Sequence, residues 1–147
     1  MGGVEGTGMR VRPASAGDRG AVIALWQRCG LTVAYNDPGK DFDFALGMPA
    51  SDVLVGEVEG AIAAAVMVGH DGHRGWLYYV GVDPERRDQG LGAVIVRAGE
   101  VWLTARGVPK VMLMVRETNT VAEGFYHAIG YETAPRIVLQ KWLPPQP

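Results

Sequence analysis

Apolar residues recur along this chain at two different spacings, and the changes of spacing predict where helices and strands lie. Val22, Leu25, Trp26 and Cys29 fall on one side of a helix that ends at Gly30. Short apolar runs bounded by turn residues predict buried strands. The predicted elements are, in order, a strand over 9–13, a helix capped by Ser15 or Asp18 and ending at Gly30, a helix over 40–48, strands over 53–58, 61–68 and 76–82, a helix from 91 to Gly107, a strand over 111–115, a helix over 120–129, and late strands over 131–133 and 137–142.

The order of these elements predicts a mixed sheet. Strands 53–58, 61–68 and 76–82 follow one another through short turns and form an antiparallel meander, with a two-residue turn at Glu59-Gly60. The strand over 76–82 is apolar on both faces, so helices should cover it on both sides. The strand–helix–strand order that follows predicts a parallel neighbour reached by a right-handed crossover. The whole order, β-α-α-β-β-β-α-β-α-β-β, is α+β and not doubly wound.

Length and glycine content predict the domain organisation. A chain of 147 residues suits one domain with a substantial core. Residues 1–8 hold four glycines without apolar periodicity, so we expect a disordered N-terminal extension. Residues 9–143 should then form a single domain, followed by a frayed tail over 144–147.

Composition and charge exclude several classes of function. Apolar residues make up 48% and charged residues 20% of the chain, as in a globular protein. A net charge of -2 without a basic run argues against nucleic acid as a partner. No apolar run approaches a bilayer span and no signal-peptide pattern opens the chain, so we expect no membrane association. The single Cys29 excludes an internal disulfide and favours the cytoplasm, and no cluster of metal-ligand spacing predicts a metal site.

The most informative stretch is 80–93, where a glycine-bearing loop joins an apolar strand to the start of a helix. Such a loop presents unpaired main-chain N–H groups, and the helix dipole adds partial positive charge. Gly90 and Gly92 lack Cβ atoms, so a ligand can lie against the main chain. The stretch therefore predicts a phosphate site, with an ordinary tight turn as the alternative.

Two common phosphate motifs do not fit this loop. Gly92 is followed by Ala93-Val94, not by the Lys-Ser/Thr of a nucleoside-triphosphate P-loop, and the three-glycine dinucleotide spacing is absent. The loop does match Arg/Gln-x-x-Gly-x-Gly/Ala, as Arg87-Asp88-Gln89-Gly90-Leu91-Gly92. With this motif the chain resembles the GNAT superfamily of acyl-CoA-dependent N-acetyltransferases, whose equivalent loop holds the pyrophosphate of coenzyme A. The resemblance covers residues 9–143 and implies the GNAT fold, which has the element order predicted above.

A second motif, on the helix predicted over 120–129, extends the resemblance. The family pattern Asn-x-x-Ala-x-x-x-Tyr-x-x-x-Gly-Phe/Tyr is matched from Asn119 through Tyr126 to Tyr131. Thr120-x-x-Glu123 is typical of a capping box, which would place Asn119 just before the helix cap. In the family the Asn contacts the pantetheine arm and the Tyr hydroxyl lies beside the thioester sulfur. Longer segments over 25–29, 36–38 and 71–79 resemble the small bacterial YpeA-type acetyltransferases, which implies the activity but no acceptor.

The resemblance implies acetyl-CoA as co-substrate and assigns residues to it. Gly81 in mid-strand predicts a bulge that leaves main-chain donors free to stabilise an oxyanion, and GNAT enzymes use a main-chain N–H at this splayed strand. The residues expected to bind the cofactor are Val80, Gly81, Val82, Arg87, Asp88, Gln89, Gly90, Leu91, Gly92, Ala93, Asn119 and Tyr126.

Acetyl transfer also requires an acid for the departing thiolate and a base for the amine. Tyr126 is the predicted acid, because a phenol of pKa about 10 can protonate the thiolate of a thiol near 8.5. The base is less defined, since Met114 stands where related ribosomal-protein alanine acetyltransferases carry Glu. We choose His73, because histidine titrates near neutrality; a solvated turn residue is the alternative. The other candidates are His70, Asp71, Glu117, Asp37 or a chain of water molecules.

The acceptor amine is expected to enter between the loop over 31–39 and the central strands. Asp37 with Asp41 and Asp43 would give this mouth a negative potential that favours a cationic amine, unless these acids only serve a solvated helix start. The acceptor would be a small-molecule amine, a protein N-terminus or a lysine, attacking acetyl-CoA directly, and a homodimer stays open. A non-catalytic acyl-CoA-binding or regulatory module on the same fold is the competing function. The predicted walls of the acceptor pocket are Asn36, Asp37, Asp71, His73 and Tyr79.

Overall fold

The computed structural model describes residues 8–145 in two compact units, 8–114 and 115–145. Each unit is described by itself below. The predicted N-terminal extension over 1–8 lies outside the described residues except for Gly8, and so do the last two residues of the predicted tail. No helix within residues 8–145 is long and apolar enough to cross a membrane.

The first unit is built on a five-stranded sheet in the order β1-β2-β3-β4-β5. Its strands pair antiparallel from β1 to β4, whereas β4 and β5 run parallel, as the strand–helix–strand order predicts. The β2–β3 hairpin turns at Glu59 and Gly60, which both have the positive φ that a two-residue turn favours. The strands are β1 (Arg10–Pro13), β2 (Ser51–Val58), β3 (Ala61–His70), β4 (Gly75–Val82) and β5 (Val111–Leu113).

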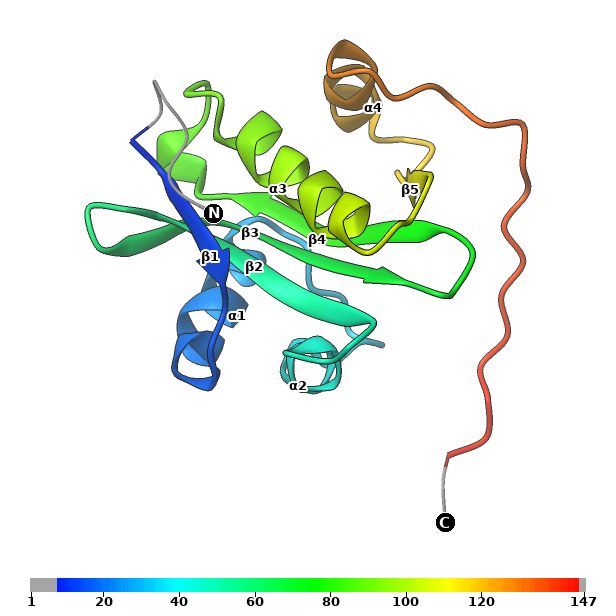
Figure 1. Cartoon of the computed structure of the whole chain (residues 1–147), viewed down its shortest axis with the longest axis horizontal. Helices are drawn as coiled ribbons and strands as arrows, with labels where there is room; N and C mark the ends of the chain where they lie inside the picture. The colour runs from blue at the N-terminus through cyan, green and yellow to red at the C-terminus, as the bar shows by residue number, and fades with distance from the viewer. Residues whose placement is uncertain (1–7, 146–147) are drawn as a thin grey trace. The chain divides into compact units, whose positions relative to one another are not determined.

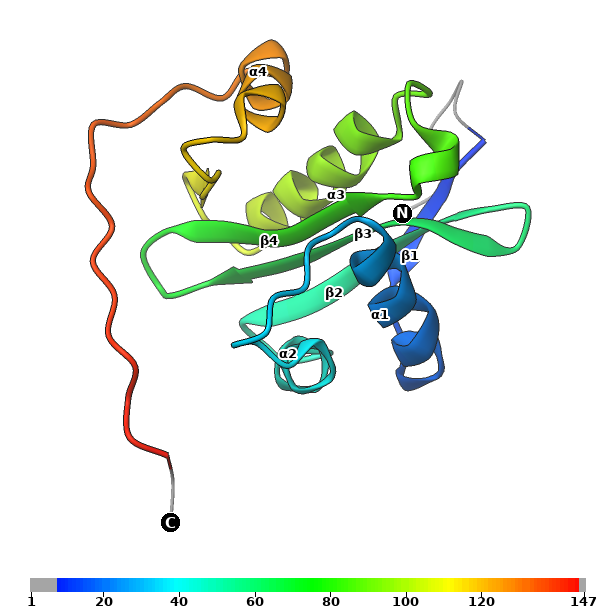
Figure 2. The same ribbon diagram turned by 180° about the vertical axis from the view of Figure 1, so that it is seen from behind.

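Helices cover both faces of this sheet (Figures 1 and 2). One face carries α3 (Leu91–Ala105), and the other carries α1 (Arg19–Arg28) and α2 (Pro38–Ala45). Two short 3-10 turns complete the unit: η1 (Ala16–Asp18) leads into α1, and η2 (Pro84–Arg86) follows β4. The sheet therefore has two cores, one on each side of its central strands.

The core beneath α1 and α2 joins the apolar side of α1 to the two middle strands. Trp26 is completely buried, and its ring meets the edge of Phe42 with 6.4 Å between centroids. Burial of each large apolar side chain contributes roughly 1.5–3 kcal/mol, so this cluster fixes both helices on the sheet. Its members are Val22, Leu25, Trp26, Phe42, Ala45, Val53, Val55 and Ala65.

The opposite core brings α3 unusually close to β4, because glycines stand at two contact points. A Cβ on Gly75 would lie 2.5 Å from Leu103 Cδ1, and a Cβ on Gly99 would lie 2.7 Å from Leu77 Cδ2. Both distances are far inside van der Waals contact, so a side chain at either position would require the leucine opposite it to move. The position of α3 on β4 is thereby fixed at two points along the helix.

The second unit contains α4 (Thr120–Ala128). The capping box predicted at Thr120 and Glu123 is wrong: Asn119 is the N-cap residue, and its Oδ1 accepts a hydrogen bond from Ala122 N at 3.0 Å. The late strands predicted over 131–133 and 137–142 are also wrong, because residues 131–145 form no strand in the structure. Apolar, β-branched residues favour a strand only where a neighbouring strand pairs with them, and Pro135 removes one donor from the segment.

Candidate active site

The loop between β4 and α3 has the backbone that the glycine motif predicts. Asp88 has φ 64° and Gly90 has φ 78°, so two left-handed residues turn the chain into the helix. Gly90 is the N-cap residue of α3, and a Cβ built on it would meet no atom of the protein within 4 Å. The space beside Gly90 is therefore open, and the left-handed backbone, not crowding, favours glycine here.

The start of α3 lacks a side-chain cap, unlike the start of α2. Asp37 Oδ1 accepts hydrogen bonds from Gly39 N at 3.0 Å and Lys40 N at 3.2 Å at the start of α2. Within residues 8–145, no side chain accepts from the first N–H groups of α3, and its first turn holds no acid. Because those N–H groups have no partner within the helix, and a fifteen-residue helix has a substantial dipole, this end of α3 suits an anion.

A bulge interrupts β4 just before this loop. Tyr78 pairs with Met67 and Gly81 with Ala65, so Tyr79 and Val80 together face one residue of β3. The residue with a left-handed backbone in this bulge is Tyr79, with φ 53°. Gly81 is glycine for another reason, since a Cβ there would lie 3.1 Å from Cys29 Sγ and 3.2 Å from Leu31 Cδ1. The predicted bulge exists, but it is displaced toward the tyrosines.

The parallel neighbour of β4 ends just before this bulge. Pairing with β5 covers Gly75, Trp76 and Leu77 only. From Tyr78 onward, this edge of β4 has no strand partner within residues 8–145. The end of the pairing leaves strand-edge groups without a strand partner at the level of the bulge, which is where the family resemblance expects the thioester.

Tyr79 lies on the face covered by α1 and α2. Its ring stacks on Trp26 with 4.2 Å between centroids, and its hydroxyl donates a hydrogen bond to Asp41 Oδ2 at 2.6 Å. Burial and the bond to Asp41 raise the pKa of Tyr79 well above its usual value, and the nearby charge of Asp37 adds to the rise. The phenol therefore keeps its proton and cannot serve as a base. Asp37 and Asp41, predicted at the acceptor mouth, do lie near this tyrosine.

Asp71 and His73 occupy the turn between β3 and β4. The main-chain N–H groups of Arg74 and His73 donate to Asp71 Oδ1 at 2.8 and 2.9 Å, and these bonds lower the pKa of the Asp71 carboxyl. Trp76 Nε1 donates to the other oxygen, so Asp71 is committed to the turn. His73 is exposed. Among the described residues, no hydrogen bond or ion pair joins His73 to Asp37 or to exposed Asn36.

In the second unit, Tyr126 belongs to an aromatic cluster. Phe125 and Tyr131 meet its ring edge-on, with centroids 5.0 and 5.7 Å away. Burial raises the pKa of Tyr126, so its hydroxyl stays protonated beyond the usual range of a phenol. The side-chain oxygen of Asn119, seven residues earlier, caps α4.

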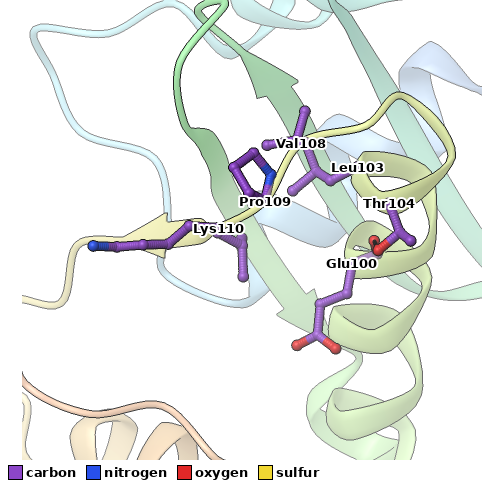
Figure 3. A pocket seen from close by; sticks show the side chains of 7 residues that line it. Glu100, Leu103, Thr104, Val108, Pro109 and Lys110 are labelled. Carbon is purple, nitrogen blue, oxygen red and sulfur yellow. Dashed lines mark hydrogen bonds between the residues drawn. The ribbon is translucent and has the colours of Figure 1, made fainter.

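Two hollows occur in the first unit, one far from the glycine loop and one that reaches its base at Asp83. The smaller, about 170 Å³, is formed by the end of α3 and the start of β5 (Figure 3), roughly 20 Å along the helix from Gly90. Leu103, Val108 and Pro109 line it, and Lys110 extends away from it. The larger, about 400 Å³, is a charged groove beside α1 that includes Arg12, Arg28 and Asp83. None of the predicted site residues lines either hollow, and no group of three metal-ligand side chains occurs within residues 8–145.

Helices cover both faces of a mixed sheet whose fourth strand bulges beyond the end of the fifth. The fourth strand then leads through a glycine turn into an uncapped helix. This is the architecture of an acyltransferase that uses coenzyme A thioesters. Residues 19–131 match the acetyltransferase (GNAT) family, and the chain belongs to that family. The predicted fold and enzyme class are thereby confirmed, and acetyl-CoA is the acetyl donor.

Similar proteins support this assignment at two levels. An acetyltransferase of Pectobacterium atrosepticum is 44% identical over 92% of this chain and 96% of its own, and one of Yersinia enterocolitica is 42% identical over the same shares. Among solved structures, an aminoglycoside acetyltransferase, AAC(6')-Iy, in complex with a CoA bisubstrate analogue has a TM-score of 0.79 at 16% identity, covering 92% of this chain and 98% of that one. The ribosomal-protein-S18-alanine N-acetyltransferase of Escherichia coli has a TM-score of 0.73 at 25% identity, covering 86% and 79%. The narrower resemblance to YpeA-type enzymes stays a prediction.

Proposed function

We propose that this chain transfers the acetyl group of acetyl-CoA to a primary amine by direct attack of the amine on the thioester. The observation that carries the proposal is the start of α3, where Gly90 takes a left-handed conformation and no side chain caps the helix. Helix N–H groups left open beside a glycine are the arrangement that binds phosphate. The pyrophosphate of acetyl-CoA would accept from the main chain between Asp88 and Ala93, with Arg87 adding charge.

The acyl end of the cofactor would lie beside the part of β4 that is no longer paired with β5. Main-chain N–H groups between Val80 and Val82 would face the thioester oxygen, where negative charge develops as the amine attacks. The bulge at Tyr79 supports this position, because it takes two residues of β4 out of the regular ladder. Asn119 would contact the pantetheine arm, an assignment that comes from the family pattern alone.

Tyr126 would donate the proton that the departing thiolate needs. Burial raises the pKa of Tyr126, which favours the protonated hydroxyl that a general acid needs. The amine's own proton has no obvious acceptor, because the side chain at position 114 is a methionine, which cannot take a proton. His73, or a water molecule bound to it, is the base that we propose, since Tyr79 keeps its proton.

The acceptor would be a small-molecule amine, a protein N-terminus or a lysine side chain. Enzymes of similar structure include both kinds: aminoglycoside acetyltransferases and the ribosomal-protein-S18-alanine N-acetyltransferase. The alternative function is a non-catalytic acyl-CoA-binding module, which the methionine at position 114 favours. Release of CoA from acetyl-CoA, followed for a panel of amino acids, polyamines, aminoglycosides and peptides, separates the two: an enzyme releases CoA faster with at least one amine, and a module does not.

Replacement of Tyr126 by Phe tests the catalytic step. General acid catalysis is worth about 10²–10⁴-fold in rate, so we expect kcat to fall in that range while acetyl-CoA affinity is nearly kept. Tyr131→Phe is the matched control, because it removes a hydroxyl from the same aromatic cluster. Equal losses in the two variants, or unaltered turnover in Tyr126→Phe, would make Tyr126 a packing residue.

A further inference from the structure

The last turn of α1 is tied to the junction between β4 and the glycine loop. Cys29 Sγ donates to the carbonyl oxygen of Val82 at 3.2 Å, and Arg28 Nη2 lies 3.5 Å from Asp83 Oδ2. The charge of Arg87, inside the loop, acts on Cys29 closely enough to oppose the rise that burial causes in the pKa of the thiol. The end of α1 and the loop are therefore neighbours in space, more than fifty residues apart in sequence.

Asp83 uses all of its polar groups at this junction. Its N–H donates to Ala63 O at 2.8 Å, and its carbonyl accepts from Arg86 N at 2.8 Å. Its Oδ1 accepts from Glu85 N at 3.0 Å and so caps η2, while Oδ2 faces Arg28. The Asp83 side chain is only 17% exposed, against 47% for Arg28. One carboxylate thus joins the end of β4, the turn η2 and helix α1.

The loop has few other anchors before α3 begins. Within the part of the chain that the structure describes, the side chains of residues 86–89 make no hydrogen bond or ion pair with another element. The next bond is between Val94 N and Gly90 O, at 3.3 Å, where the helix has already started. A small rotation at Asp83 would therefore redirect every amide between it and Gly90. Converging donors need to be held within roughly 0.5 Å, so the anchor matters.

We propose that Asp83, held by Arg28, is a positioning residue for the acetyl-CoA loop. The proposal rests on the use of this loop for the pyrophosphate of acetyl-CoA. Arg28 fixes the direction in which the loop leaves β4, and its positive charge offsets a carboxylate that would otherwise repel the pyrophosphate. Loss of Arg28 alone should then be worse than loss of both charges, because it leaves Asp83 unpaired.

The test uses Arg28→Gln, Asp83→Asn and the double variant, with Kd for acetyl-CoA measured by calorimetry. Asn keeps an oxygen that can cap η2 but carries no charge. We expect Arg28→Gln to weaken binding about fivefold, the scale of a partly exposed ion pair, and the double variant to bind more tightly than Arg28→Gln. The value of kcat at saturating acetyl-CoA and the KM of the acceptor should not change. Arg28→Lys should restore part of the affinity.

Arg19→Gln is the matched control. It breaks the ion pair of Arg19 with Asp43, which also leaves α1 but runs to α2, at 2.8 Å. Unchanged Kd in this control, with a similar shift of Tm in all variants, would attribute the loss to the loop and not to folding. Three results would overturn this inference but not the proposed function. They are wild-type affinity in Arg28→Gln, an additive loss of affinity in the double variant, and an equal loss of affinity in Arg19→Gln. Absence of acetyl-CoA binding in the wild-type chain would overturn the proposed function itself, and the inference with it.

Discussion

Two helices of the first unit begin in opposite ways. At the start of α2, Asp37 precedes Pro38 and accepts from two main-chain N–H groups, and Asp41 adds negative charge in the first turn. At the start of α3, Gly90 offers no side chain and the first turn holds no acid. The chain satisfies its own donors at α2 and leaves them open at α3. The missing cap at α1 follows a 3-10 turn that leads directly into the helix, so at α3 it is the missing cap together with a left-handed glycine that supports the proposed anion site.

The largest effect is expected when the open helix start is blocked. Gly90→Val forces a β-branched residue into a left-handed conformation and places a side chain where the pyrophosphate would lie. We expect affinity for acetyl-CoA to fall at least about 100-fold, measured by calorimetry.

Gly107→Val is the control for backbone strain. Gly107 has φ 75°, almost the φ of Gly90, and a Cβ there also meets open space, but it stands beyond the other end of α3. Its affinity for acetyl-CoA should stay near that of the wild type. Undiminished binding in Gly90→Val would contradict the role of the open helix start, and an equal loss in Gly107→Val would reduce it to strain.

A second variant makes α3 begin as α2 does. Gly90→Asp supplies a carboxylate cap at a position where Asp tolerates the left-handed conformation. The folded state should keep its Tm, while acetyl-CoA binds about tenfold more weakly than in the uncharged variant Gly90→Asn, because the carboxylate competes with the pyrophosphate. Equal affinities in Gly90→Asp and Gly90→Asn would indicate that no anion binds at this point.

At α2 the expected effect is on stability. Asp37→Ala removes a cap and should cost about 1 kcal/mol, seen as a lower Tm, whereas Asp37→Asn and Asp37→Ser should restore most of it. Acetyl-CoA affinity should not change in any of the three. The same variants test the sequence prediction that Asp37 lines the acceptor pocket. A raised acceptor KM in Asp37→Asn, at wild-type Tm, would support that role, and an unchanged KM would leave Asp37 as a cap alone.

The smallest effect is expected at the β3–β4 turn. There the Asp71 carboxylate accepts hydrogen bonds from main-chain N–H groups, as the Asp37 carboxylate does. His73 beside it is exposed, so bulk water competes with it as a proton acceptor. His73→Ala should lower the acetylation rate by less than about tenfold near pH 7, with partial recovery at higher pH, where more of the amine is free. Parallel pH–rate profiles of the variant and the wild type would remove His73 from the chemistry.

Features that depend on local sequence were predicted well. The helices and strands from residue 9 to α4, the β2–β3 turn and the parallel β4–β5 pair follow from periodicity and from turn residues. The start of α2 was placed two residues late, although Asp-Pro is a recognisable pair of N-cap and first helical residue. Features that depend on distant partners were missed. No local signal pairs Tyr79 with Asp41, which lies 38 residues away.

The bulge illustrates why the remainder was out of reach. Glycine tolerates positive φ, so Gly81 was the natural choice for the irregular residue. Its real constraint is the contact with Cys29 and Leu31, which only the packed structure reveals. Tyr79 holds the left-handed conformation instead, with Trp26 beneath its ring and Asp41 at its hydroxyl. Strain at a non-glycine residue persists where neighbours over-determine it, and sequence patterns do not report neighbours.

The close contacts at Gly75 and Gly99 have a consequence for cofactor choice. They let α3 pack closely on β4 at two points, and this packing sets the distance between the β4 bulge and the uncapped helix start. Under the proposed function, the helix start would face the pyrophosphate of the acyl donor and the bulge would face its thioester. An acyl donor whose phosphate and thioester are separated by this distance would contact both the helix start and the bulge. A shorter thioester would contact only one of them. Under the proposed function, we therefore expect the packing of α3 on β4 to favour acyl donors of that length.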